Sequence, residues 1–163
     1  MLISKKNKGF LILDDFKFRC AIGKNGIKLR KREGDKATPS GKFFIGKLYY
    51  RADRVKKPLT KITTKTIKKN MGWCDDPNSQ HYNKEILIKN EVKYEKLFRN
   101  DSLYDYLIVI NYNTKKTEPY KGSAIFIHLT KNYKPTDGCI ALKERDFLIL
   151  TKLINKKSTI KIA

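Results

Sequence analysis

Short apolar runs that end at turn-forming residues dominate this chain and constrain its fold more than any other feature. Residues 9–13, 17–22, 26–30 and 42–50 are such runs, and Asp, Asn, Gly and Pro separate them. This spacing and turn chemistry are typical of consecutive strands in a meander. In the run 17–22, side chains of period two share one face, which predicts that Cys20 is a small core residue. We therefore expect a mainly β protein.

Two longer apolar runs, at 104–112 and 123–128, show no polar alternation. Such runs are typical of central strands buried on both faces. Residues 143–154 differ, because their apolar residues recur with helical spacing after a polar first turn. They predict one helix near the C-terminus, followed by a last short strand at 158–163. The stripe that defines the helix consists of Phe147, Leu150, Thr151 and Ile154.

Residues 51–103 are more irregular than the rest of the chain. We expect a loop-rich insertion here, with short strands at 60–63 and 86–88 and one helical turn near 93–99. A long irregular segment inside a compact domain is more often functional than ornamental. The insertion is therefore expected to contribute to a binding site.

The chain has 163 residues, which suits one domain, and we expect residues 1–163 to fold as one monomeric unit. Its net charge is +21, and 30 of its 37 basic residues are lysines spread along the whole sequence. Specific nucleic-acid recognition usually relies on arginine and on a concentrated basic strip. A lysine-rich solvated surface is therefore the preferred interpretation, and no nucleic-acid partner is expected.

Three cysteines without a Cys-x-x-Cys pair argue against a disulfide framework and against a cysteine-rich zinc site. No apolar run approaches the roughly 18 residues of a membrane span, and the N-terminus shows no signal peptide. The expected location is cytoplasmic for the chain as given. A leader that was removed, or a non-standard export route, would place it in the periplasm or cell envelope.

His128 and Cys139 form the clearest candidate for chemistry. His128 ends an apolar run, and Cys139 follows eleven residues later, directly after Gly138. A cysteine attacks as a thiolate, so it needs a neighbouring base, and a strand end is a rigid platform for one. The alternative is that Cys139 begins a buried strand and His128 is a satisfied core histidine. The spacing alone leaves both interpretations open.

The segment from His128 to Leu142, with Thr136-Asp137-Gly138-Cys139 inside it, resembles the active-site signature of the L,D-transpeptidase catalytic domain, the YkuD-type fold. Residues 34–46, Gly-Asp-Lys-Ala-Thr-Pro-Ser-Gly and the strand that follows, resemble the second motif of the same family. Together the paired motifs are specific, and the resemblance covers roughly residues 8 to 155. It implies a mainly β sandwich with one C-terminal helix and a long insertion between the motifs.

The resemblance also implies roles for individual residues. Cys139 is the nucleophile, and His128 is its base and later its acid. A backbone carbonyl beside the histidine, from Leu129 or nearby, orients the imidazole. Backbone N–H groups of Gly138 and Cys139 form the oxyanion hole, and the hydroxyl of Thr136 supports the loop.

Three positions depart from the family pattern. Asp137 stands where a His is usual, Ala141 replaces an Arg, and Leu129 replaces a Gly. The missing Arg is a candidate for holding a substrate carboxylate in the family, so another cation is expected to take its place. Arg is scarce in this chain, and the expected stand-ins are Arg51, Arg54 and Arg99.

The segment 72–83 contains Cys, Asp and His, the residue types of metal sites, but its spacing matches no common zinc motif. A structured loop with Asp bonds around Pro77 is one alternative. The preferred interpretation is a loop that forms a wall of the active-site cleft, in contact with the substrate. Its expected contact residues are Trp73, Asp75, His81 and Tyr82, joined by Thr136 and Asp137 of the cysteine loop.

The sequence therefore leads to a cysteine acyl-transfer enzyme that acts on peptidoglycan stem peptides or muropeptides and needs no metal or cofactor. An L,D-transpeptidase passes the acyl group to an amine, whereas an L,D-carboxypeptidase passes it to water. A non-catalytic basic module that binds anionic glycan or nucleic acid is the alternative from another class.

Overall fold

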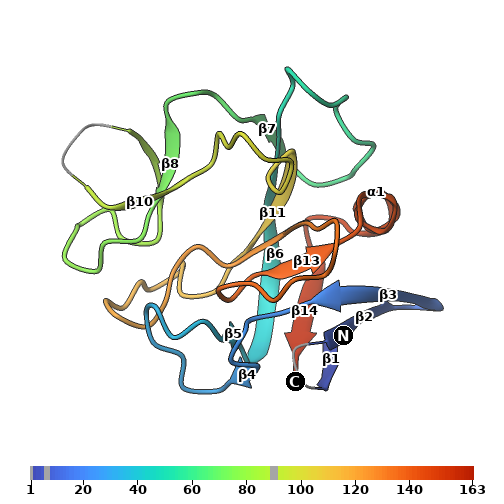
Figure 1. Cartoon of the computed structure of the whole chain (residues 1–163), viewed down its shortest axis with the longest axis horizontal. Helices are drawn as coiled ribbons and strands as arrows, with labels where there is room; N and C mark the ends of the chain where they lie inside the picture. The colour runs from blue at the N-terminus through green and yellow to red at the C-terminus, as the bar shows by residue number, and fades with distance from the viewer. Residues whose placement is uncertain (1, 6–7, 89–91) are drawn as a thin grey trace.

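The computed structural model describes residues 2–5, 8–88 and 92–163, and it is mainly β with one α-helix in these ranges. The largest sheet has nine strands (Figure 1). In spatial order they are β11 (Tyr106–Ile110), β12 (Phe126–Leu129), β13 (Ile140–Leu142), β3 (Phe16–Ala21), β2 (Lys8–Leu13), β1 (Leu2–Lys5), β14 (Thr159–Ile162), β6 (Gly41–Tyr50) and β7 (Thr64–Thr66).

The large sheet closes on itself through β6. The first half of this strand pairs with β14, and its second half pairs antiparallel with β11, the strand at the other end of the order. β1 and β14 are parallel neighbours, so both ends of the chain take part in the same sheet (Figure 1). Closure of this kind gives the two-layered sandwich that the sequence predicts, with apolar side chains enclosed between the layers.

β11 separates two apolar clusters because successive side chains of a strand point to opposite faces. Tyr106, Ile108 and Ile110 contribute to the main core between the layers. Leu107 and Val109 contribute to a second cluster on the other face. The prediction of a central strand buried on both faces is therefore confirmed.

The helix α1 (Glu144–Leu153) lies where the apolar spacing predicts it. Phe147 and Leu150 are buried in the main core, and the acidic residues Glu144 and Asp146 occupy its first turn. Negative charge is favourable there because the helix dipole is positive at the N-terminus. Cys20 is buried in the same core, as predicted.

The insertion contains more regular structure than its sequence suggests. β8 (Met71–Cys74) pairs with β9 (Glu85–Leu87) on one side and β10 (Tyr94–Lys96) on the other, and forms a second sheet. The predicted helical turn at 93–99 is wrong, because this segment supplies β10. The predicted strand at 60–63 is displaced to β7 at Thr64–Thr66. A small parallel pair, β4 (Ile27–Lys28) and β5 (Thr38–Pro39), completes the fold.

The second sheet covers the outer face of β11 and β12. Met71, Trp73 and Leu97 of the insertion pack into the second cluster with Val109 and Phe126. Trp73 meets Phe126 edge-on, with 5.3 Å between ring centroids. The insertion is thus fixed to the large sheet by its own apolar core, which gives the site between them a firm wall.

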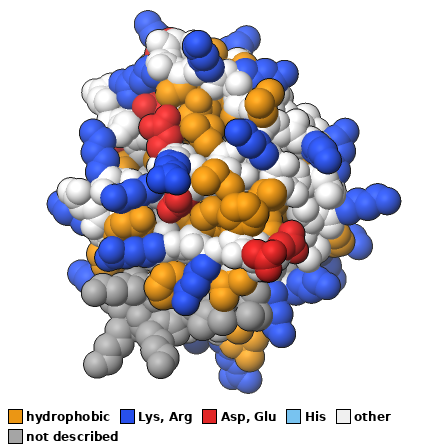
Figure 2. All heavy atoms as spheres, turned by 90° about the vertical axis from the view of Figure 1, so that its right-hand side faces the viewer, with side chains coloured by type: hydrophobic (Ala, Val, Ile, Leu, Met, Phe, Trp, Pro, Cys, Tyr) orange, Lys and Arg blue, Asp and Glu red, His pale blue; other side chains and the backbone are white. Residues whose placement is uncertain are grey.

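Lysine and arginine side chains are spread over the face of the molecule shown in Figure 2 and do not form one strip there. Acidic side chains are fewer on this face. Within the part of the chain that the structure describes, no helix has the length and apolar character needed to cross a membrane.

Candidate active site

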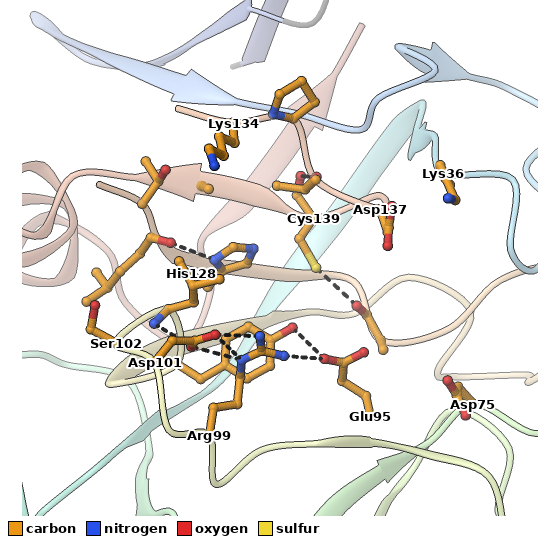
Figure 3. A pocket seen from close by; sticks show the side chains of 18 of the residues that line it. Lys36, Asp75, Glu95, Arg99, Asp101, Ser102, His128, Lys134, Asp137 and Cys139 are labelled. Carbon is orange, nitrogen blue, oxygen red and sulfur yellow. Dashed lines mark hydrogen bonds and ion pairs between the residues drawn. The ribbon is translucent and has the colours of Figure 1, made fainter. Parts of the chain in front are cut away.

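His128 and Cys139 are brought together by two neighbouring parallel strands. β12 carries His128, and Cys139 immediately precedes β13, whose Ile140 pairs with Ile127. By the alternation along β12, His128 points to the same face as Phe126, which is the face that the insertion covers. Figure 3 shows both side chains directed toward a common pocket. The sheet register therefore places a base beside a thiol.

The pocket is a cleft of about 800 Å³ between the large sheet and the insertion. His128, Cys139 and Ala141 line it from the sheet side, and Asp75 and Glu95 line it from the insertion. Charged side chains of both signs surround the thiol and the imidazole (Figure 3). A cleft of this size and polarity suits a peptide-like ligand.

The orientation of His128 follows from one hydrogen bond. Its Nδ1 lies 2.8 Å from the carbonyl oxygen of Leu129, as the family resemblance leads one to expect. A carbonyl can only accept, so Nδ1 carries the proton and Nε2 keeps its lone pair. Burial lowers the pKa of His128 to about 4. At neutral pH the imidazole is therefore a neutral base with a fixed tautomer, and its ring packs edge-on against Tyr104 at 5.2 Å.

The thiol of Cys139 is held by the backbone of the preceding strand segment. Sγ donates to the carbonyl of Ala124 at 3.2 Å and accepts from the N–H of Phe126 at 3.4 Å. Burial raises the pKa of Cys139 to about 12. The resting pair is thus a neutral thiol and a neutral imidazole, so the thiol must transfer its proton during attack.

The loop before Cys139 is braced by its own threonine. The hydroxyl of Thr136 donates to the carbonyl of Cys139 at 2.6 Å and accepts from the N–H of Gly138 at 3.2 Å. The φ angle of Gly138 is 139°, which side chains rarely tolerate, so glycine is required here. Because its N–H is bonded to Thr136, Gly138 is not a ready oxyanion donor in this conformation. The N–H of Cys139 is the other donor that the sequence predicts for the oxyanion hole.

The upstream Thr-Pro motif supports the same loop from behind. The hydroxyl of Thr38 accepts from the N–H of Gly23 at 2.8 Å. Around Thr136, the N–H donates to Ile22 and the carbonyl accepts from Lys24. The two motifs that are about a hundred residues apart in sequence therefore meet at the cysteine loop, which explains why they occur together.

Trp73 and Tyr82 are not among the residues that line the cleft, and their expected contact with substrate stays a prediction. The Trp73 indole N–H donates to Oδ1 of Asn83 at 2.9 Å, and the same oxygen accepts from the N–H of Ala124 at 3.1 Å. Asn83 thereby holds Ala124, whose carbonyl accepts the hydrogen bond of the Cys139 thiol. The phenol of Tyr82 donates to Glu33, which does line the cleft.

His81 is exposed and is not among the residues that line the cleft. Its expected contact with the substrate therefore has no support from the cleft lining and stays a prediction. Asp75 does line the cleft, and its buried Oδ1 has no hydrogen-bond partner among the residues that the structure describes. Desolvation by burial raises the pKa of Asp75. Asp137 also lines the cleft, where its expected contact with the substrate stays a prediction.

Arg51 is buried and is not among the residues that line the cleft, and its expected contact with substrate stays a prediction. Its guanidinium binds Asp53 and the carbonyl of Arg99, and it stacks on the ring of Phe98 at 3.4 Å. These contacts use its charge to fix the chain at the end of the insertion.

Arg54 and Arg99 do line the cleft, but both are already paired. Arg54 binds the carboxylate of Asp105 at 3.2 Å and two backbone carbonyls. Arg99 binds Asp101 at 2.6 Å and lies 3.5 Å from Glu95. Lys134 is exposed, and it points into the cleft beside His128 (Figure 3).

Sequence reasoning missed Glu95, Tyr104 and Lys31 in the cleft. The phenol of Tyr104 donates to Glu95 at 3.1 Å, and burial raises the pKa of both groups. The sequence predicts a helical turn at 93–99, and a helical turn does not indicate which face Glu95 occupies. In the structure Glu95 belongs to the strand β10. In the described ranges, no group of three or more His, Cys, Asp or Glu residues could hold a metal ion.

Comparison with known protein families gives a match. A family model described as the L,D-transpeptidase catalytic domain, YkuD, matches residues 2–162. The chain therefore belongs to the L,D-transpeptidase catalytic domain family, and this membership supports an enzymatic function on peptidoglycan. No curated protein and no solved structure matches the chain.

Proposed function

We propose that the protein is a cysteine acyl-transfer enzyme that acts on peptidoglycan stem peptides through a Cys139 thioester. The observation that carries this proposal is the pairing in one cleft of a thiol and an imidazole whose tautomer is fixed by the Leu129 carbonyl. That tautomer leaves Nε2 free to accept a proton. A histidine that served only to pack the core would not need to line a cleft.

The reaction begins when Nε2 of His128 takes the proton of Cys139 and Sγ attacks the substrate carbonyl. The bond in question joins the L-centre of the third stem residue to the terminal D-amino acid. The S–C bond forms, the carbonyl electrons move to oxygen, and the N–H of Cys139 donates to that oxygen. Collapse of the intermediate breaks the C–N bond, and His128 returns its proton to the leaving amine. A thioester remains on Cys139.

The second half of the reaction repeats these transfers in reverse. An amine or a water molecule gives a proton to His128 and attacks the thioester carbonyl, and the Cys139 thiol leaves with that proton. Attack by an amine gives a cross-link, which is L,D-transpeptidation. Attack by water gives a tripeptide, which is L,D-carboxypeptidation and suits the trimming of recycled muropeptides.

A stem carboxylate needs a cation near Ala141, where the usual Arg is missing. Arg54 and Arg99 already bind carboxylates, whereas no acceptor for Lys134 is found among the described residues. Lys134 lies on the loop between His128 and Cys139 and points into the cleft (Figure 3). We therefore assign the substrate carboxylate to Lys134.

The test is incubation of the purified protein with a tetrapeptide muropeptide, followed by mass spectrometry of the products. A dimer with loss of the terminal D-amino acid identifies a transpeptidase, and a tripeptide identifies a carboxypeptidase. Cys139→Ala is expected to abolish both products. Turnover retained in this variant would remove Cys139 from the mechanism. A matched control is Cys20→Ala, because Cys20 lies in the main core outside the cleft.

A further inference from the structure

Lys31 is a buried cation at the edge of the proposed active site. Only 3% of its side chain is exposed, yet it lines the same cleft as Cys139. Burial of an ammonium is costly, so a protein keeps one only where it is paired or serves a function. Lys31 meets the first condition through its ion pair with Asp35, and its place beside the cysteine loop raises the second.

Two glycines make room for this side chain. A Cβ added to Gly122 would lie 2.7 Å from Cε of Lys31 and 3.1 Å from its Cδ. A Cβ added to Gly138 would lie 3.5 Å from the Lys31 ammonium itself. Both glycines have positive φ, at 102° and 139°. The Lys31 stem thus passes against one loop, and its charge reaches the residue next to Cys139.

Asp35 holds the ammonium in this position. Nζ of Lys31 donates to Oδ1 of Asp35 at 2.7 Å, and the carboxylate also accepts from the N–H groups of Arg32 and Ala37. Burial alone would raise the pKa of Asp35, but these hydrogen bonds lower it. Asp35 is therefore a fixed anion that anchors Lys31. The other acceptor of Nζ among the described residues is the carbonyl of Arg32 at 3.4 Å, so one of three N–H donors remains.

Apart from Lys31, the charged groups that act on Cys139 are carboxylates, which disfavour a negative charge on its sulfur. Burial raises the pKa of Cys139 most, Glu95 and Asp137 raise it further, and Lys31 lowers it. Tyr104 faces the same region and remains neutral because burial raises its pKa well above the usual value. Within this set, Lys31 is the cation that acts on the thiol.

We propose that Lys31 is a positioning residue that acts through Cys139: the Lys31 ammonium stabilises the negative charge that develops on the Cys139 sulfur during attack. Asp35 orients this ammonium, and the two glycines admit it. This inference rests on the proposed function, in which Cys139 is the nucleophile. The Gly-Asp-x-x-Thr-Pro motif would then have two roles: Thr38 supports the cysteine loop, and Asp35 holds the Lys31 ammonium.

The test measures the pH dependence of Cys139 alkylation by iodoacetamide, together with turnover of a tetrapeptide muropeptide. In Lys31→Met the alkylation profile should move to higher pH by about one unit, and the rate at a fixed pH should fall about tenfold. The value of kcat should fall by a similar factor, with little change in KM. A purely structural effect would lower turnover without moving the alkylation profile.

The matched control is Lys28→Met. Lys28 is exposed, lies three residues away and is not among the residues that line the cleft, so the same loss of charge should leave the profile in place. If Lys31→Met does not fold, Lys31→Gln replaces it, because an amide can still donate to Asp35.

An unshifted profile in the folded Lys31 variant would overturn this inference while leaving the proposed function intact. Wild-type protein that neither reacts at Cys139 nor turns over the muropeptide would instead overturn the proposed function. The two failures are therefore distinguishable in one set of measurements.

Discussion

The two walls of the cleft are built in different ways. The His128–Cys139 wall comes from adjacent strands of the closed sheet, where pairing fixes which side chains meet. The opposite wall comes from residues 51–103, whose second sheet is attached through individual contacts such as Trp73 on Phe126. In the first wall, the alternation of side chains along the strands determines which residues face the cleft. In the second wall, local contacts such as the bond from Trp73 to Asn83 determine where a side chain points, so residue type says little about its role.

The first prediction tests the sheet wall and has the largest expected effect. His128→Gln removes the base but keeps a side chain that can donate to the Leu129 carbonyl. We expect kcat/KM for muropeptide turnover to fall by about 10²- to 10⁴-fold, with the free energy of unfolding nearly unchanged. Chemical denaturation of the same sample supplies the control. A loss of less than tenfold in a folded variant would exclude His128 as the general base.

The second prediction concerns the pH profile of the same wall. The pKa of His128 lies near 4 because the ring is buried, so the base stays neutral well below pH 6.5. We expect kcat/KM to stay flat as pH falls from 8 to 5, and then to fall toward pH 4 as proton uptake removes the Nε2 lone pair. A half-maximal point between pH 6 and 7 would show that the histidine is not desolvated as the structure indicates.

The third prediction concerns the cation beside the sheet wall. Lys134→Ala should raise KM for a carboxylate-bearing stem by roughly two- to fivefold, because an exposed ion pair contributes little free energy. Lys152→Ala removes the same charge from helix α1, away from the cleft, and should leave KM unchanged. Equal effects in both variants would mean that only the net charge matters.

The sequence predicted the sheet wall well, and the reasons are physical. The apolar runs that become β11 and β12 encode burial on both faces, and the alternation in them directs His128 toward the insertion. The family resemblance supplied the proposed roles of His128 and Cys139, and it led to the expectation of the hydrogen bond from His128 to the Leu129 carbonyl. The helix also follows from its spacing, since one stripe of apolar side chains meets the core.

The insertion was predicted poorly because residue type does not reveal orientation there. Trp73 and Tyr82 look like ligand-binding side chains, but Asn83 and Glu33 bind their polar atoms. Arg51 looks like a substrate cation, but Asp53 pairs with it. Lys31 could not be singled out among 30 lysines, because its burial depends on where two glycines lie in space.

The fourth prediction tests the insertion wall and has the smallest expected effect. The sequence predicts that His81 contacts the substrate, but His81 is exposed and absent from the cleft lining. His81→Ala should change kcat/KM by less than about twofold, as is usual for a surface substitution. Steady-state kinetics beside the His128→Gln variant would make the contrast direct. A tenfold loss would mean that the insertion approaches the substrate differently.

The most direct test of the central claim is intact-protein mass spectrometry after rapid mixing with a tetrapeptide muropeptide and acid quenching. The account predicts an added mass equal to the substrate minus its terminal D-amino acid, and peptide mapping should locate it on Cys139. Product formation without such an adduct, or an adduct located on Cys20 or Cys74, would contradict it.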